Sequence, residues 1–291
     1  MLDKYLIREL LDQKLKVKIL TLPGHENDLL DQLPPFDLSQ VSFVGEIKAA
    51  FHQTDILISS LFFFQLNEPY TFSKQDVKIA LDLLEEAELA NISKIIWLAR
   101  APVFRRGDIK AIDYQGKINR VLTTSKIPFT IVRPTLFFNE LTIFFEQARK
   151  GKVYLPCYGQ NKINPIYIGE FASICISSIY SDRKHKTVGG GEVFTCWEIL
   201  ELMYKLLDQP PKISFISTAL YKAYISLCCL FQPDKTAAFK KFKLRILTND
   251  IIGRPVGKNS LFDFFSEKVE QDLGINPNPY FKIGNYKEKR I

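Results

Sequence analysis

Short apolar runs alternate with stretches of helical spacing along the first half of the chain. The apolar runs are rich in β-branched and aromatic residues, which favours strands. We expect strands at Val17–Leu22, Val41–Gly45, Asp55–Ser60, Lys94–Leu98 and Phe129–Val132. The stretches around them predict helices at Leu2–Leu15, Asp28–Leu33, Ile47–Phe51, Ser73–Leu89 and Ile112–Thr124. Alternating strands and helices are typical of βαβ units, so the sequence predicts an α/β fold with a parallel sheet.

Two of the apolar runs have the features of neighbouring strands. Ile95–Leu98 and Thr130–Val132 are short, largely apolar, and joined by a segment that contains a predicted helix. This arrangement predicts adjacent parallel strands that are buried on both faces and connected by a right-handed crossover.

The pattern changes after Gly151. Here we expect strands at Val153–Leu155 and Ile213–Ile216 and helices at Gly169–Tyr180, Thr195–Leu207, Ala219–Leu230, Ala237–Thr248 and Ser260–Asp272. Thr195 followed by Glu198 has the spacing of a capping box. We therefore divide the chain into residues 1–150 and residues 151–291, and expect the two regions to pack as one structural unit.

The stretch F-T-I-V-R-P-T-L-F-F-N-E-L, from Phe129 to Leu141, combines a buried strand with polar residues at its carboxyl end. Pro134 ends the strand because it has no N–H for the ladder, and Thr135 and Asn139 follow among aromatic residues. Ligands of open α/β sheets bind at this end of the strands. A ligand site and a core strand with an ordinary turn both fit the pattern.

Composition narrows the class of protein. The chain has 46% hydrophobic and 24% charged residues, which excludes global disorder. Its net charge of +7 is spread along the sequence and comes without zinc spacing or a basic array, so no nucleic-acid partner is indicated. The five cysteines and three histidines form no metal-binding set, and predict reduced thiols in a cytoplasmic protein.

The longest apolar stretch, Ile213 to Phe231, carries Lys222 and several hydroxyl groups near its middle. These residues argue against a membrane-spanning helix and leave a membrane-surface helix open.

Segments spread over nearly the whole chain carry a family resemblance. They are K-Y-L-I-R-E-L-L, S-K-I-I-W-L, G-K-I-N-R-V-L, F-T-I-V-R-P-T-L-F-F-N-E-L, I-N-P-I-Y-I-G-E-F-A, V-G-G-G-E-V-F-T-C-W-E-I-L-E-L and L-T-N-D-I-I-G-R-P-V-G-K-N-S-L-F-D-F-F. In this order and spacing they resemble the atypical short-chain dehydrogenase/reductase superfamily, in its NmrA-like, NAD(P)-binding branch. The resemblance implies a Rossmann-like, doubly wound parallel sheet with a small C-terminal α/β cap. It also implies an oxidoreductase-like function with NADP or NAD as cofactor.

The start of the chain departs from the family. Members begin with a short strand and a G-x-x-G-x-x-G turn that delivers the pyrophosphate to the first helix. Here the helix from Leu2 starts almost at Met1. The missing strand would lie between those at Val17 and Asp55, which leaves two unpaired strand edges deep in the core. An upstream start, a decayed copy and a rearranged sheet are the explanations left open, and we expect poor dinucleotide binding from the sequence as given.

The cofactor preference is open as well. NADP-binding relatives often place an arginine after the strand that corresponds to Val17–Leu22, and this chain has T-L-P-G-H-E there, with only His25 nearby.

The resemblance also implies catalytic residues. Reductases of the superfamily use a Tyr-x-x-x-Lys pair and a serine that positions the substrate oxygen. Lys117 matches the lysine, whereas Asp113 stands at the tyrosine position and Ala99 at the serine position. Tyr114 lies three residues before Lys117, shares a helical face with it, and is the candidate substitute. Alternatively, Tyr114 is a half-buried helix residue and Lys117 only holds the nicotinamide ribose.

These assignments define the expected site. The cofactor is assigned to Ser59, Ser60, Ala99, Lys117, Pro134, Thr135 and Phe137, the substrate to Phe138 and Asn139, and catalysis to Lys117 and Tyr114. We expect Ser59, Ala99, Lys117, Pro134 and Thr135 to line one cleft. The expected partners are a dinucleotide and an unknown small molecule. A redox sensor or assembly factor on the same fold, and a membrane-surface protein, are the alternative functions.

Overall fold

The computed structural model describes residues 2–20, 38–61, 63, 74–100, 110–155, 158–231, 244 and 247–274. The chain divides into two compact units, and each unit takes two separate stretches of the sequence. The first unit comprises Met1–Pro134 and Ile168–Val188, and the second comprises Thr135–Tyr167 and Gly189–Ile291.

A parallel sheet forms the centre of the first unit. Of the five described strands of this sheet, four lie mainly in the first unit. They are β3 (Ile56–Ser59), β4 (Lys94–Leu98), β5 (Phe129–Pro134) and β8 (His185–Gly189), in the order β8-β5-β4-β3. β4 and β5 are parallel neighbours, with Ile95 opposite Phe129 and Leu98 opposite Val132. All residues of β4 are buried, and so are Phe129 to Val132 of β5. The prediction of two adjacent, buried parallel strands is confirmed.

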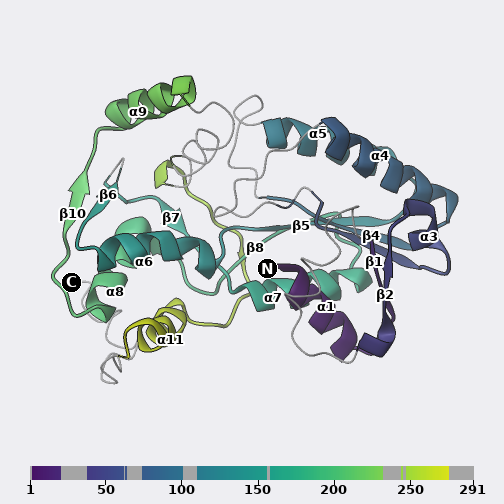
Figure 1. Cartoon of the computed structure of the whole chain (residues 1–291), viewed down its shortest axis with the longest axis horizontal. Coiled ribbons are helices and arrows are strands. Elements are labelled where there is room, and N and C mark those ends of the chain that lie inside the picture. Colours follow the sequence, from purple (N-terminus) through teal and green to yellow (C-terminus); the bar gives the residue numbers. More distant parts are fainter. Residues whose placement is uncertain are drawn as a thin grey trace. The chain divides into compact units, whose positions relative to one another are not determined.

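Helices cover both faces of this sheet (Figure 1). On one face, α4 (Lys74–Leu89) and α5 (Lys110–Thr124) pack on Ile95, Trp97 and Ile131 in a single apolar cluster. Successive side chains of a strand point to opposite faces. Ile96, Leu98 and Val132 therefore face the other layer, where α1 (Leu2–Asp12) packs against α7 (Ile168–Ser177). These two layers give the expected α/β, doubly wound architecture.

The short helix η3 (Ser178–Tyr180) follows α7 and is linked to the sheet by two side chains. Lys94 Nζ donates to the Ser181 carbonyl oxygen at 2.6 Å, and Thr130 Oγ1 donates to the same oxygen at 3.5 Å. Burial lowers the pKa of Lys94, and nearby Asp182 partly opposes this effect.

A second, two-stranded parallel sheet of the first unit holds β1 (Val17–Leu20) and β2 (Val41–Val44), with η1 (Leu38–Gln40) before β2 and α3 (Ile47–Phe51) after it. Among the described strands, none pairs with both β1 and β3. The expected pair of open edges stays a prediction, because the residues that follow β1 and most of those that follow β3 lie outside the described ones. Most residues of β1 and β3 are half-buried rather than fully buried.

The second unit has two small strand pairs. β6 (Val153–Leu155) is parallel to β10 (Ile213–Phe215), and β7 (Lys162–Ile163) is antiparallel to β9 (Phe194–Thr195). A further short strand is β11 (Arg254–Pro255). The helices are η2 (Phe138–Leu141), α6 (Thr142–Arg149), α8 (Cys196–Leu206), α9 (Thr218–Phe231) and α11 (Leu261–Leu273). The capping box at α8 is confirmed, because Glu198 N donates to Thr195 Oγ1 and Thr195 N donates to Glu198 Oε2.

Not every observed strand was predicted, and some predicted elements cannot be tested. Strand β8 was not predicted, because H-K-T-V-G is polar at its start and runs into three glycines. The helix expected at Asp28–Leu33, the cap Ser73 and most of the helix expected at Ala237–Thr248 lie outside the described residues.

Asn164 organises the polar interior of the second unit. It is fully buried, and its side-chain amide donates to the carbonyl oxygens of Gly190 at 3.1 Å and Gly253 at 3.0 Å. Its Oδ1 accepts from Gly253 N at 2.9 Å. Its carbonyl oxygen accepts from Thr135 Oγ1 at 2.6 Å. The Asn164 side chain thus joins its own segment to the segments that contain Gly190 and Gly253.

The glycine triplet fits around this side chain. A Cβ at Gly189 would clash with the Asn164 amide group, and one at Gly190 would clash with the Pro165 carbonyl oxygen. Both positions require glycine because the backbone segments approach each other closely.

We expect Asn164→Asp to destabilise the protein by about 3 kcal/mol, because two buried carbonyl oxygens lose their donor and meet a carboxylate. Chemical denaturation measures the change in the free energy of unfolding. Asn91→Asp, at an exposed position, is the control and should leave it within about 0.5 kcal/mol. Equal stability of the two variants would contradict the role of Asn164.

His185, at the start of β8, has a lowered pKa. Burial, Arg133 and Lys184 lower its pKa, in that order of importance. Its Nδ1 lies 3.3 Å from Arg133 Nη1, and its ring packs edge-on against Phe129 with 6.1 Å between ring centroids. The folded state therefore favours the neutral imidazole.

Because the pKa of His185 is lower in the folded state, its contribution to stability is complete above the unfolded value near 6.5. We expect that contribution to disappear as the pH falls below about 6.5 toward the folded value. His185→Gln should flatten the dependence of the melting temperature on pH in this window. An unchanged dependence in the variant would show that other groups cause it.

Candidate functional site

The carboxyl ends of β3, β4 and β5 meet at one edge of the first unit, because these strands are parallel neighbours. Ser59 ends β3 and Ser60 follows it, Ala99 and Arg100 follow β4, and Pro134 ends β5. Ser59, Ala99 and Arg100 are almost completely buried. This edge is where a parallel α/β sheet binds ligands.

The first turn of α1 reaches the edge through one hydrogen bond. Ser60 Oγ donates to Asp3 Oδ1 at 2.9 Å. Farther along α1, Ser173 Oγ of α7 donates to Glu9 Oε2 at 2.8 Å. The buried residues Leu2, Leu6 and Ile7 provide the apolar side of α1. The contacts with α7 and Ser60 hold the amino end of α1, and its positive dipole end, at the carboxyl end of β3.

Arg100 brings a positive charge to the same edge. It is 3% exposed, and its guanidinium carbon lies 5.5 Å from the centroid of the Phe63 ring. Phe63 in turn stacks on Phe171 of α7, with 5.9 Å between centroids. A cation over an aromatic face is stabilised by the ring quadrupole. The aromatic pair therefore helps to fix the guanidinium beside the strand ends.

Asp3 and Arg100 are site residues that sequence reasoning missed. For Arg100 the signal was available, since an arginine stands two residues after a largely apolar strand, at the ligand-binding edge. Asp3 looked like an ordinary polar position of an amphipathic helix, and only the packing of α1 relates it to Ser60.

The predicted site residues fall into two groups. Ser59, Ser60, Ala99 and Pro134 lie at the edge in the first unit, and Lys117 is exposed on α5 of the same unit. Tyr114 lies on α5, with its side chain outside the described residues, and His25 is also outside them. The common cleft expected for Ser59, Ala99, Lys117, Pro134 and Thr135 stays a prediction.

The other predicted residues belong to the second unit and have internal partners. Thr135 Oγ1 donates to the Asn164 carbonyl oxygen, and Phe137 N donates to Glu140 Oε2 at 2.9 Å. Phe138 packs against Phe264, with 5.5 Å between ring centroids. The carbonyl oxygen of half-buried Asn139 accepts from Thr142 Oγ1.

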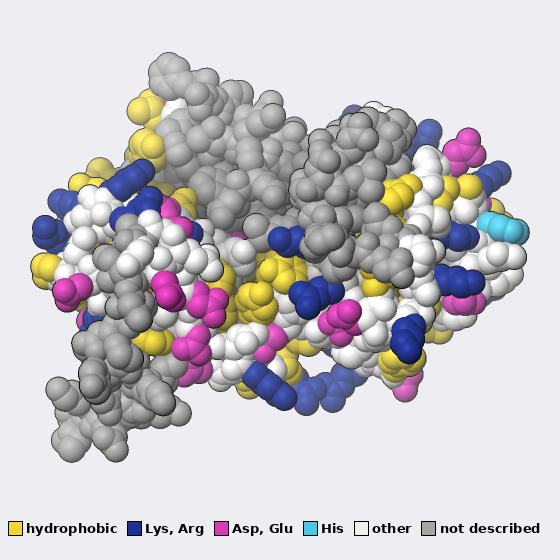
Figure 2. Space-filling view, turned by 60° about the horizontal axis from the view of Figure 1, so that its bottom comes forward, with side chains coloured by type: hydrophobic (Ala, Val, Ile, Leu, Met, Phe, Trp, Pro, Cys, Tyr) yellow, Lys and Arg dark blue, Asp and Glu magenta, His cyan; other side chains and the backbone are white. Residues whose placement is uncertain are grey.

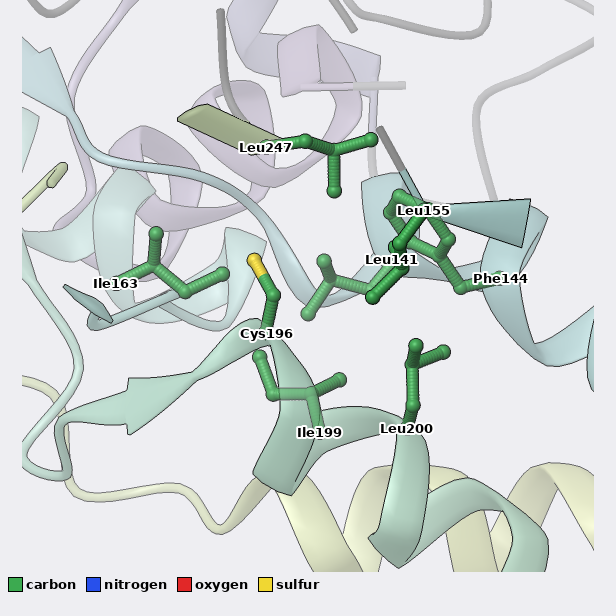
Figure 3. A pocket seen from close by; sticks show the side chains of 8 residues that line it. All are labelled: Leu141, Phe144, Leu155, Ile163, Cys196, Ile199, Leu200 and Leu247. Atoms are coloured by element: carbon green, nitrogen blue, oxygen red, sulfur yellow. The ribbon is translucent and has the colours of Figure 1, made fainter. Parts of the chain in front are cut away.

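The second unit also contains a small apolar pocket (Figure 3). Its lining residues are Leu141, Phe144, Leu155, Ile163, Cys196, Ile199, Leu200 and Leu247. Its space of about 10 Å³ holds no more than one water molecule. The pocket is a packing gap of the core and has no room for a substrate in this conformation.

Other chemistry is limited in the described part of the chain. No group of three or more His, Cys, Asp or Glu residues that could hold a metal ion occurs there. Burial raises the pKa of the Cys175 thiol well above its usual range, which disfavours the reactive thiolate. No described helix is long and apolar enough to cross a membrane. On the face shown in Figure 2, basic and acidic side chains are interspersed, as the even spread of charge along the sequence predicts.

No family model and no curated protein matches the chain in sequence. Solved structures do match it. A nucleoside-diphosphate-sugar epimerase from Staphylococcus aureus is 15% identical, with a TM-score of 0.63 over 95% of this chain and 93% of that one. An NADPH-dependent quinone oxidoreductase from Escherichia coli, in complex with NADPH, is 15% identical, with a TM-score of 0.67 over 92% and 96%. A triphenylmethane reductase from Citrobacter, in complex with NADP(H), is 14% identical, with a TM-score of 0.61 over 89% of both chains.

These matches cover nearly the full length of each chain at low identity. The protein has the Rossmann-like α/β fold of these reductases and epimerases.

Proposed function

We propose that this chain is an NAD(P)-binding, oxidoreductase-like protein of the NmrA-like type that holds its dinucleotide weakly. The observation that carries the proposal is the convergence of Ser60, Arg100 and the amino end of α1 at the carboxyl edge of the parallel sheet. In this proposal residues 1–150 bind the dinucleotide and residues 151–291 form the substrate-binding cap. Two of the neighbours of known structure are complexes with NADPH or NADP(H), which supports the same ligand class here.

The edge suits an anionic ligand in three respects. The guanidinium of Arg100 supplies a fixed positive charge, and the Ser60 hydroxyl supplies a donor. The first N–H groups of α1 add the positive end of the helix dipole. Together they fit phosphate groups, and a bound nicotinamide dinucleotide would supply the hydride chemistry.

Asp3 opposes the same ligand. Its carboxylate accepts the Ser60 hydrogen bond and lies in the first turn of α1, where it neutralises part of the dipole. A phosphate group there would meet a negative charge and a donor already in use. The expected result is a lower affinity rather than a different ligand.

Catalysis is weak in this proposal. The methyl group of Ala99 stands at the edge where reductases of this type have a serine hydroxyl, and Asp113 stands at the tyrosine position. Tyr114 and Lys117 remain the proposed catalytic pair, with Thr135 and Phe137 at the cofactor and Phe138 and Asn139 at the substrate. NADP and NAD both remain open.

A second candidate is a non-enzymatic redox sensor or assembly factor on the same fold. The buried Ala99, which cannot supply a hydroxyl to a substrate, favours it. A sensor binds the dinucleotide without turnover, so loss of NADPH absorbance with quinone or dye acceptors separates the two candidates. We further propose a cytoplasmic location, because the buried Cys175 is a thiol outside any disulfide.

Fluorescence titration of the purified chain with NADPH and NADH tests the proposal. We expect saturable binding that is weaker than micromolar, which corresponds to less than about 8 kcal/mol. Asp3→Asn keeps an oxygen acceptor for Ser60 but removes the charge, and should tighten binding up to about fivefold. Arg100→Gln should weaken binding about tenfold through loss of a charge-assisted hydrogen bond.

The control is Asp12→Asn, which removes an acid at the opposite end of α1, where Asp12 pairs with Arg8 on the surface. Its affinity should equal that of the parent chain. Thermal unfolding of Arg100→Gln shows whether the variant is folded before its affinity is interpreted. Micromolar affinity of the parent chain, or equal effects of Asp3→Asn and Asp12→Asn, would overturn the proposal.

A further inference from the structure

Three basic side chains gather around Phe129 in the first unit. Arg133 Nη1 lies 3.3 Å from His185 Nδ1, and the His185 ring packs edge-on against Phe129. Lys184 Nζ lies 5.6 Å from the centroid of the same ring. The strand pairing positions them, because His185 is opposite Ile131 and the Lys184 carbonyl oxygen accepts from Ile131 N at 2.8 Å. We call Arg133, Lys184 and His185 the β8 basic cluster.

The β8 basic cluster lies on the face of the sheet that α4 and α5 cover. Phe129 and Ile131 belong to the apolar cluster of that face, and Arg133 follows Ile131 by two residues. The helix α1, which carries Asp3, packs with α7 on the other face. The cluster is therefore separate from the contacts of α1 on which the proposed dinucleotide site depends.

The positive charge of Arg133 is partly removed from water. Arg133 is half-buried, and burial lowers the pKa of its guanidinium. Among the described residues, no carboxylate pairs with Arg133, and the groups that shift the pKa of His185 are the cations Arg133 and Lys184. The nearby acid Asp182 acts instead on Lys94, which belongs to the other face of the sheet. Cations that are removed from water are normally paired, so the cluster suits an anionic ligand.

The polar groups that the cluster offers to a ligand are donors. A guanidinium cannot accept a hydrogen bond, so Arg133 donates to His185 Nδ1, and the neutral imidazole then carries its proton on Nε2. Arg133 keeps further N–H groups, and Lys184 adds an ammonium group at an exposed position. Arg133 and Lys184 carry two positive charges, whereas a phosphate group carries between about −1.5 and −2 at neutral pH.

We propose that the β8 basic cluster binds a phosphate group. The remaining N–H groups of Arg133 fit two phosphate oxygens as a fork, and the compact ammonium of Lys184 acts as a point charge beside them. His185 fixes the guanidinium through Nδ1 and offers its Nε2–H as a further donor. A phosphate group suits the cluster better than a carboxylate, because its charge matches both cations and its three oxygens match donors from separate side chains.

Proton NMR of the full chain during titration with inorganic phosphate tests the proposal at the His185 ring. The chain has three histidines, and His185→Gln identifies the His185 signal by its loss. At constant pH we expect a saturable shift of that signal at millimolar phosphate. Sodium chloride at equal ionic strength should give no saturable shift, because chloride cannot fill the fork of the guanidinium.

Variants separate the cluster from general attraction of anions. Arg133→Gln should weaken phosphate binding at least about tenfold through loss of charge-assisted hydrogen bonds, and Arg133→Lys should give an intermediate affinity because it keeps the charge without the fork. Lys184→Gln, at an exposed position, should weaken binding about threefold and leaves the half-buried guanidinium in place. Arg8→Gln removes the same charge from the surface of α1 and should bind phosphate like the parent chain. Thermal unfolding shows whether each variant is folded.

Other anions identify the source of the phosphate group. Tighter binding of glycerol 3-phosphate than of inorganic phosphate would identify a small phosphate monoester as the ligand, and the reverse order would identify the free ion. Either order supports the site. Acetate should bind at least about tenfold more weakly than phosphate, because it has one charge and two oxygens.

Three results would overturn the proposal. The first is no saturable shift of the His185 signal with inorganic phosphate or glycerol 3-phosphate. The second is equal phosphate affinity of the parent chain and a folded Arg133→Gln variant. The third is acetate binding as tight as phosphate binding. None of these results bears on the proposed dinucleotide site, which is tested with NADPH and the variants of Asp3 and Arg100.

Discussion

Parallel pairing of β3, β4, β5 and β8 is the constraint on which the first unit depends. Parallel neighbours cannot be joined by a tight turn, so each connection crosses over a face of the sheet. Both faces are then covered, which is why β4 and most of β5 are apolar and buried. The same pairing places the carboxyl ends of the strands at one edge. The position of the candidate site is thus a consequence of strand direction.

The amino end of α1 determines what that edge can bind. Packing against α7 brings its first turn to Ser60, where a dipole end and a nearby guanidinium favour an anion. Asp3 places a negative charge at the same point. In the proposed function, the affinity for a dinucleotide depends on the balance between Arg100 and the helix dipole on one side and Asp3 on the other.

Elements with strong local patterns could be predicted from the sequence. The runs Ile95–Leu98 and Thr130–Val132 are apolar on both faces, and the Thr195–Glu198 capping box depends on neighbouring residues only. Strand β8 could not be predicted, because its pairing with β5 comes from the tertiary fold rather than from its own composition. The place of Ser59, Ser60 and Ala99 at the carboxyl ends of strands could also be predicted, because they follow apolar runs. Their role in cofactor binding stays a prediction. The contacts of Asp3 with Ser60 and of Arg100 with Phe63 join distant parts of the sequence, and periodicity carries no information about them.

Hydrogen exchange of the full chain, with and without a high concentration of NADPH, tests most directly whether this edge is the dinucleotide site. If it is, NADPH should slow exchange at the carboxyl end of β3 and in the first turn of α1. Protection should be stronger in Asp3→Asn at the same concentration. Protection confined to the second unit, or none in either chain, would contradict a dinucleotide site at the carboxyl edge of the parallel sheet.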